Sequence, residues 1–160
     1  MAWPTKVSPT CRGNHTAPVF FSDTDREVYL AMLLESCRSF KLDVWAYCLM
    51  TNHVHLIAVP RERASMAGAI GRCHMRYSRW INKQRAWTGH LWANRYHSSL
   101  LGDEHLWNAV RYVEQNPVRA RMVAKCEEWP WSSTRPCTAC ASGCVIKQYH
   151  AVPRQRDRLA

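Results

Sequence analysis

Two closely spaced histidines have the residue type and the spacing of a metal site. His53 and His55 are separated by one residue within an apolar run. Side chains two apart on a strand project from the same face, so both imidazoles would converge. Convergent imidazoles are a start for a divalent metal site, although they do not complete one. Taken alone, the pair is better interpreted as one structural and one solvent-exposed histidine.

A tyrosine and an asparagine form the second chemical candidate. Tyr112 and Asn116 are four residues apart, so they would share one face of a helix that ends near Pro117. An amide oxygen is a hard ligand that suits Mg²⁺ or Mn²⁺. Taken in isolation, a half-buried core tyrosine and a polar asparagine at a helix end are the better interpretations of these residues.

The two groups together would support cleavage of a phosphodiester. If the helix of Tyr112 packs beside the histidine strand, an ion would polarise a scissile phosphate and the tyrosine oxygen would attack in line. A phenol ordinarily has a pKa of about 10, so attack needs activation. The metal, Arg95, Arg111 or Arg119 could supply it, and the sequence does not decide between them. The covalent phosphotyrosine would conserve the phosphoester energy, so a second DNA end could reverse the reaction without a nucleotide cofactor.

The overall charge points to a polyanionic partner. The 160 residues carry a formal net charge of +10, which favours nucleic acid over a generic basic surface or an anionic membrane contact. Apolar residues make up 47% and charged residues 21%, which argues against wholesale disorder. No segment is long and apolar enough to span a membrane, and the N-terminus lacks the apolar core of a signal peptide. We therefore expect a cytoplasmic protein.

The elements that must position these residues alternate between strand and helix patterns. We expect strands at 7–12, 42–50, 53–59 and within 89–101, and helices at 24–39, 64–83 and 103–117. A capping box formed by Thr24 and Glu27 would start the first helix, and Pro117 would end the last. The resulting order, βαββαβα, is that of an α+β, ferredoxin-like (RRM-like) fold, in which helices back an antiparallel sheet.

The second predicted helix carries a basic stripe at helical spacing, opposite its apolar face. The stripe consists of Arg72, Arg76, Arg79 and Lys83. Because no acidic residue follows Glu62 in this helix, we expect the stripe to track phosphates, with a merely solvated face as the alternative. Trp80 and Trp87 border the stripe, where core packing is favoured over base stacking.

Eight cysteines separate into two groups. Cys11, Cys37, Cys48 and Cys73 lie in structured segments, where we expect reduced, buried thiols. The late group is Cys126, Cys137, Cys140 and Cys144. The last three, with His150, have ligand-like spacing for zinc, and Cys126 could substitute for one ligand, but a second Cys-x-x-Cys pair is missing and free thiols are favoured. The composition changes after residue 133, so we divide the chain into a domain at 1–133 and a Cys- and Arg-rich tail at 134–160.

Several ordered blocks resemble the REP-associated tyrosine transposases of bacteria, which belong to the single-tyrosine HUH transposases. The blocks are 12–14 with 19–21, then 46–56, which contains the His-Val-His sequence, 88–96, 112–120 and 131–133. The resemblance covers about residues 7–133, and ordered blocks at compatible spacing are far more specific than any single motif. Thr51 departs from the family, which usually has proline before the Asn-His pair.

The resemblance implies a ferredoxin-like domain that cleaves single-stranded DNA beside an imperfect palindromic hairpin. It implies a 5′-phosphotyrosine at Tyr112 and a free 3′-hydroxyl on the other product. It also implies Mg²⁺ or Mn²⁺ held by His53, His55 and Asn116. The residues that we expect to bind nucleic acid are Arg12, Arg72, Arg76, Arg79, Lys83, Arg95, Arg111 and Arg119.

Two other interpretations stay open at this point. A non-catalytic module that binds single-stranded nucleic acid on an RRM-like sheet would explain the charge and the fold. A zinc-stabilised regulatory protein would explain the late cysteines. The sequence leaves the oligomeric state, monomer or homodimer, and the recognised hairpin open.

Overall fold

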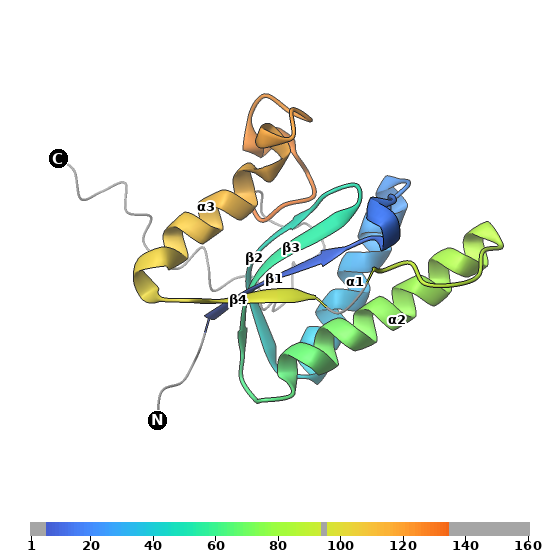
Figure 1. Ribbon diagram of the computed structural model, residues 1–160, viewed down its shortest axis with the longest axis horizontal. Coiled ribbons are helices and arrows are strands. Elements are labelled where there is room, and N and C mark those ends of the chain that lie inside the picture. The colour runs from blue at the N-terminus through green and yellow to red at the C-terminus, as the bar shows by residue number, and fades with distance from the viewer. Residues whose placement is uncertain (1–5, 94–95, 135–160) are drawn as a thin grey trace.

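The computed structural model describes residues 6–93 and 96–134 of the chain (Figure 1). Its strands and helices, in chain order, are β1 (Lys6–Arg12), α1 (Asp23–Ser39), β2 (Leu42–Leu49), β3 (His53–Pro60), α2 (Ser65–Arg85), β4 (His97–Leu101) and α3 (Asp103–Arg119). Two single 3₁₀ turns, η1 (Asn14–Thr16) and η2 (Cys126–Glu128), complete the described elements. The order confirms the predicted βαββαβα arrangement of an α+β fold.

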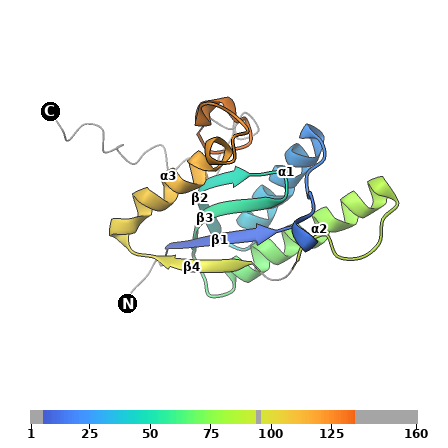
Figure 2. The same ribbon diagram turned by 45° about the horizontal axis from the view of Figure 1, so that its top comes forward.

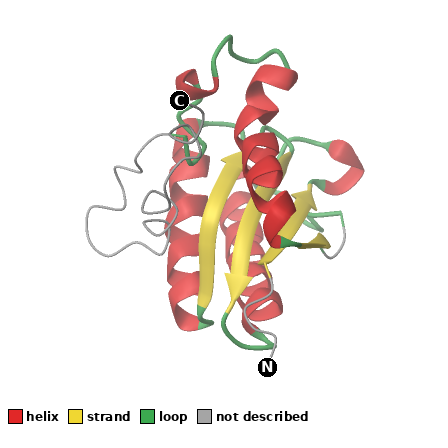
Figure 3. Ribbon diagram, turned by 90° about the vertical axis from the view of Figure 1, so that its left-hand side faces the viewer, coloured by secondary structure: helices red, strands yellow, loops and turns green. Residues whose placement is uncertain are grey.

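The four strands form one antiparallel sheet in the order β2-β3-β1-β4. Helices α1 and α2 cover one face of the sheet, and α3 crosses the other (Figures 2 and 3). Alternation along β3 sends Val54, Leu56 and Ala58 into the core beneath α1 and α2, and Ile57 into a second core beneath α3. His53 and His55 have the parity of Ile57, so they belong to the α3 face.

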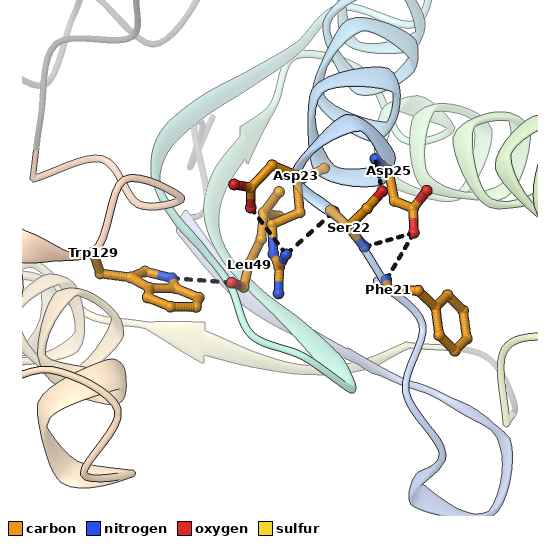
Figure 4. A network of polar contacts seen from close by, with 7 residues as sticks. Phe21, Ser22, Asp23, Asp25, Leu49 and Trp129 are labelled. Atoms are coloured by element: carbon orange, nitrogen blue, oxygen red, sulfur yellow. Dashed lines mark hydrogen bonds and ion pairs between the residues drawn. The ribbon is translucent and has the colours of Figure 1, made fainter.

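The start of α1 lies two residues earlier than the predicted capping box. Ser22, not Thr24, is the N-cap, and its hydroxyl accepts from the backbone N–H of Asp25 at 3.2 Å. The Asp25 carboxylate in turn accepts from the N–H groups of Ser22 and Phe21, at 3.0 and 2.7 Å (Figure 4). The earlier start prevails because it satisfies three backbone donors that the predicted box would leave to water.

The end of α3 lies two residues beyond the predicted one. Pro117 is buried within the helix, which continues to Arg119. A proline removes one helical hydrogen bond, to the carbonyl of Val113. That carbonyl accepts instead from the side-chain Nδ2 of Asn116, at 3.4 Å. The predicted stop at Pro117 is therefore wrong, and burial of the proline ring accompanies the extra turn.

A closing segment after α3 covers the outer edge of the sheet. The N–H of Leu49 donates to the carbonyl of Trp131 at 2.8 Å, and that of Ser133 to the carbonyl of Tyr47 at 3.0 Å. The indole of Trp129 donates to the Leu49 carbonyl at 3.1 Å (Figure 4). The guanidinium carbon of buried Arg26 lies 5.5 and 5.8 Å from the ring centroids of Trp129 and Trp131. The segment therefore pairs the edge of β2 that would otherwise stay open.

The cysteine predictions divide between described and undescribed residues. The four early cysteines are free and buried, as expected: Cys11, Cys37, Cys48 and Cys73. Burial raises the pKa of Cys11 and Cys48 to about 12, so these thiols are inert. Of the late cysteines, Cys126 is free and partly exposed, whereas Cys137, Cys140 and Cys144, together with His150 and all of the tail except Thr134, lie outside the described residues. None of the described helices has the length and apolarity needed to cross a membrane.

Among the tryptophans that the structure describes, all but Trp87 pack against one of the two cores. Trp80, Trp92 and Trp131 pack partly buried against the core beneath α1 and α2, and Trp107 and Trp129 against the core beneath α3. Trp87 is instead 47% exposed. The expectation of core packing is wrong for Trp87, because α2 ends just before it and turns its side chain outward.

A partly buried histidine joins α1, α2 and the segment before β4. The ring of His74 stacks on Trp92 with centroids 3.9 Å apart, and its Nε2 lies 3.1 Å from the hydroxyl of Tyr29. Burial lowers the pKa of His74 to about 3, so the folded protein holds this imidazole neutral.

This burial predicts a component of acid sensitivity. The unfolded chain binds a proton at this histidine below about pH 6.5, whereas the folded chain does not, so stability is lost as the pH falls. Between pH 7 and pH 5, the free energy of unfolding of the wild type should fall by up to about 2 kcal/mol more than that of His74→Phe, which keeps an aromatic ring against Trp92. Urea denaturation at several pH values measures the two slopes. Equal slopes would contradict a neutral, buried His74.

Candidate functional site

The two histidines at the start of β3 point to the same face and touch each other. The ring centroids of His53 and His55 lie 4.7 Å apart, with the planes at 87°. His55 is buried and His53 is partly exposed. The pair therefore has one imidazole enclosed in the protein and one at the border with solvent.

Each imidazole is anchored through its Nδ1 atom. Nδ1 of His53 donates to the side-chain oxygen of Asn52 at 2.6 Å, and Nδ1 of His55 lies 3.1 Å from the hydroxyl of Thr10 on β1. Thr10 stands directly opposite His55 in the β1–β3 register. With both Nδ1 atoms engaged, Nε2 is the nitrogen that each ring would offer to a metal ion.

The surroundings keep both imidazoles neutral. Burial lowers the pKa of both histidines, to about 4 for His55. The positive charge of Arg12 lowers the pKa of both further, and a charge on His53 would do the same for His55. Arg12 is the β1 residue that pairs with His53 across the sheet. Because a metal binds only the neutral imidazole, both rings are in the protonation state that metal binding requires.

Helix α3 brings Tyr112 to the histidine pair. Its apolar stripe packs on the sheet and consists of the buried residues Leu106, Val110, Val113 and Pro117. Tyr112 lies beside this stripe, 45% exposed, with its ring centroid 6.0 Å from that of His55. The guanidinium carbon of Arg119 lies 4.8 Å from the same tyrosine ring. The tyrosine is therefore next to the imidazoles and open to solvent.

Asn116 follows Tyr112 by one helical turn. Its side-chain Nδ2 donates to the backbone carbonyls of Tyr112 and Val113, at 2.8 and 3.4 Å. These bonds use the donor end of the amide and leave Oδ1 as the end that could bind a cation. No group of three or more His, Cys, Asp or Glu side chains is placed to hold a metal within residues 6–93 and 96–134. Within the described residues the ring contacts join the two imidazoles to Tyr112, and Asn116 lies one helical turn further along α3.

The basic stripe of α2 does not line this site. It lies on the layer opposite α3, and two of its arginines are already paired. Arg72 and Arg76 contact Glu35 of α1, at 3.3 and 2.6 Å. The expectation that no acidic residue pairs with the stripe is therefore wrong for Arg72 and Arg76. The sequence of α2 alone does not indicate that a carboxylate of the neighbouring helix lies beside them.

The other predicted nucleic-acid contacts have varied positions. Arg79 and Lys83 are exposed and form no ion pair with any residue that the structure describes. Arg111 is exposed on α3, next to the tyrosine. Arg95 lies outside the described residues.

Loops at one end of the sheet hold the histidine strand in place. The N–H of Gly13 donates to the carbonyl of Asn52 at 2.8 Å, and the Asn52 side chain donates to the carbonyl of Thr16 at 3.0 Å. A Cβ atom at Gly13 would lie 2.2 Å from the carbonyl oxygen of Ala17, so only glycine fits this turn. The anchoring roles of Asn52 and Thr10 were missed from the sequence. Adjacency to His53 could have indicated the first, whereas the second depends on strand register.

Comparison with known proteins connects this geometry to a family. Residues 10–116 match the family described as "Transposase IS200 like". A protein of Haemophilus influenzae named as a REP-associated tyrosine transposase is 24% identical over 110 residues, which cover 62% of each chain. The chain therefore spans 62% of the length of this relative.

Solved structures share the fold. The structure of a REP-associated tyrosine transposase bound to a REP hairpin superposes with a TM-score of 0.69 at 14% identity, over 83% of this chain and 80% of that one. A crystal structure of a transposase from Deinococcus radiodurans gives 0.52 at 17% identity, over 72% and 92%. The match of residues 10–116 spans most of the described chain. The chain belongs to the IS200-like transposase family.

Proposed function

We propose that this chain is a metal-dependent endonuclease and strand transferase for single-stranded DNA, acting beside REP-like palindromic hairpins. The observation that carries the proposal is the contact of an exposed tyrosine, Tyr112, with the anchored, neutral pair His53 and His55. The relatives named for REP elements motivate the substrate class.

The donor set fits a divalent cation. His53 and His55 would bind through Nε2 and Asn116 through its amide oxygen, with water or phosphate oxygens completing the coordination of Mg²⁺ or Mn²⁺. When bound, the ion supplies polarisation of the scissile phosphate and stabilises its developing charge. Thr10 and Asn52 keep the two rings oriented for that purpose.

Tyr112 is the nucleophile in this proposal. Its oxygen attacks the phosphorus, its proton passes to solvent, and the bond to the 3′ oxygen breaks. One product carries a 5′-phosphotyrosine and the other a 3′-hydroxyl. Attack of another 3′-hydroxyl on the phosphotyrosine would rejoin DNA and release the tyrosine. No external energy source is needed because the phosphoester is exchanged and not hydrolysed.

Arg119 is the arginine that packs on the tyrosine. Its guanidinium carbon lies 4.8 Å from the ring centroid, so it is placed to orient the phenol ring and to meet the DNA backbone beside it. Arg12, opposite His53 on β1, and Arg111, exposed beside Tyr112, are placed to contact the DNA backbone around the site.

The geometry argues against the alternative of a non-catalytic RRM-like module. Such modules read bases on an open sheet face. Here α3 occupies that face over β2 and β3, and its buried side chains form a core with the sheet. That core consists of Ala46, Cys48, Met50, Ile57, Leu106, Val110 and Val113. An open reading surface on these strands is therefore blocked.

Replacing the nucleophile tests the proposal. Wild type incubated with Mn²⁺ and a labelled single-stranded hairpin should form a protein–DNA adduct that survives denaturation. Tyr112→Phe should reduce adduct formation on the order of 10³-fold or more, as loss of a covalent nucleophile does. Because the ring is half exposed, the variant should keep the melting temperature of the wild type. Tyr96→Phe is the matched control and should form the adduct normally. An adduct of undiminished yield in Tyr112→Phe would exclude this tyrosine.

The anchoring of the imidazoles gives a separate metal-binding prediction. Thr10→Val removes the hydroxyl beside His55 Nδ1 with little change in shape. We expect the affinity for Mn²⁺, measured by titration calorimetry, to fall about 10–100-fold, the usual loss when a ligand's supporting hydrogen bond is removed. Ser8→Ala, two residues away on the same face of β1, should leave the affinity unchanged. Equal affinities for wild type and Thr10→Val would show that the ring needs no such support.

A further inference from the structure

An aromatic side chain is held on the surface just after α2. Trp87 is 47% exposed, in contrast to the other described tryptophans, which are partly buried. The chain leaves the helix through Ala86 in a left-handed conformation, with φ 52° and ψ 38°, and the N–H of Trp87 donates to the carbonyl of Asn82 at 2.9 Å. The backbone therefore fixes the direction of this residue.

Two neighbours support the indole. The ring centroid of Phe21 lies 5.4 Å from that of Trp87, in an edge-to-face contact at 80°. The guanidinium carbon of Arg85 lies 3.8 Å from the Phe21 centroid and 5.2 Å from the Trp87 centroid. An exposed indole backed by a second ring and a guanidinium combines the groups on which unpaired nucleobases stack.

The surface around Trp87 is positively charged. Arg79, Lys83 and Arg85 occupy the last two turns of α2, and none forms an ion pair within the described part of the chain. The first half of the helix differs, because Arg72 and Arg76 both form ion pairs with Glu35. Free positive charge beside an exposed aromatic ring suits a nucleic-acid strand, in which phosphates alternate with bases.

The loop before α1, which carries Phe21, connects this surface to the histidine strand. The N–H groups of Val19 and Phe20, just before Phe21, donate to the carbonyl of Thr51 at 2.9 and 3.1 Å. Thr51 precedes His53 by two residues. In Figure 2 the C-terminal end of α2 and the loop after β1 lie at the same end of the sheet. A strand leaving the histidine site could reach Trp87 along this end.

We propose that Trp87, backed by Phe21 and Arg85, is a stacking platform for an unpaired base of single-stranded DNA flanking the hairpin. The inference rests on the proposed function, since it names a contact for the DNA that the site would cut. A stacked base must be free of its partner, so the platform binds the single-stranded flank and not the stem. The competing role of Trp87 is a purely structural staple between α2 and the loop before α1.

Binding measurements separate the two roles. The full chain carrying Tyr112→Phe, which cannot form the covalent adduct, is titrated without metal against a hairpin with a single-stranded flank and against the same stem with blunt ends. Adding Trp87→Ala should weaken binding of the flanked hairpin about 5–150-fold, the scale of losing one base–aromatic stack. Binding of the blunt hairpin should change less than twofold. Met75→Ala, which removes a side chain that is 48% exposed on α2, is the matched control and should change neither.

A second readout needs no loss-of-function variant. 2-Aminopurine placed in turn at each flank position should be quenched at one position on binding, and Trp87→Phe should retain most of the affinity. The proposal is overturned if the flanked hairpin binds Trp87→Ala as tightly as its parent, if both hairpins lose affinity equally, or if no flank position is quenched. Because cleavage is not measured, a failure here leaves the adduct experiment to decide the catalytic proposal separately.

Discussion

The packing of α3 against the sheet is the interaction on which the rest of this structure depends. Leu106, Val110 and Val113 bury their side chains on the face that carries the histidines. That burial fixes both the rotation of the helix and its distance from β3, so Tyr112 lies beside His55. Without it, the tyrosine and the imidazoles would be separate surface features, and the cleavage that we propose would require both groups together.

The sheet adds a second constraint by controlling the state of the imidazoles. Burial and the charge of Arg12 hold both rings neutral, and hydrogen bonds with Thr10 and Asn52 fix their orientation. This arrangement lowers the stability of the fold in acid, because an imidazole that is buried in its neutral form must then bind a proton. The fold thus keeps His53 and His55 neutral at physiological pH. Burial of His74 on the other face of the sheet adds to the acid sensitivity of the folded protein.

Periodic features of the sequence were predictable, and long-range contacts were not. The period of two placed His53 with His55, and the helical period placed Tyr112 with Asn116, because both depend only on local geometry. The pairing of Glu35 with α2 and the support of His55 by Thr10 depend on helix packing and strand register, so no local pattern contains them. The cap of α1 and the end of α3 shifted by two residues because neighbouring side chains satisfied backbone groups that local rules assign to water. Trp87 was expected in the core because size and apolarity predict burial, but the position of the helix end decides it.

The position of a bound ion relative to the tyrosine tests the central claim most directly. The protein with labelled tyrosine rings is titrated with Mn²⁺, and paramagnetic broadening of each ring is followed by NMR. If the ion binds between the paired imidazoles and the last turns of α3, Tyr112 should broaden first, well before Tyr29 and Tyr77, which lie beneath the opposite face of the sheet. Saturation of the Mn²⁺ site with the Tyr112 signal unaffected would contradict the account.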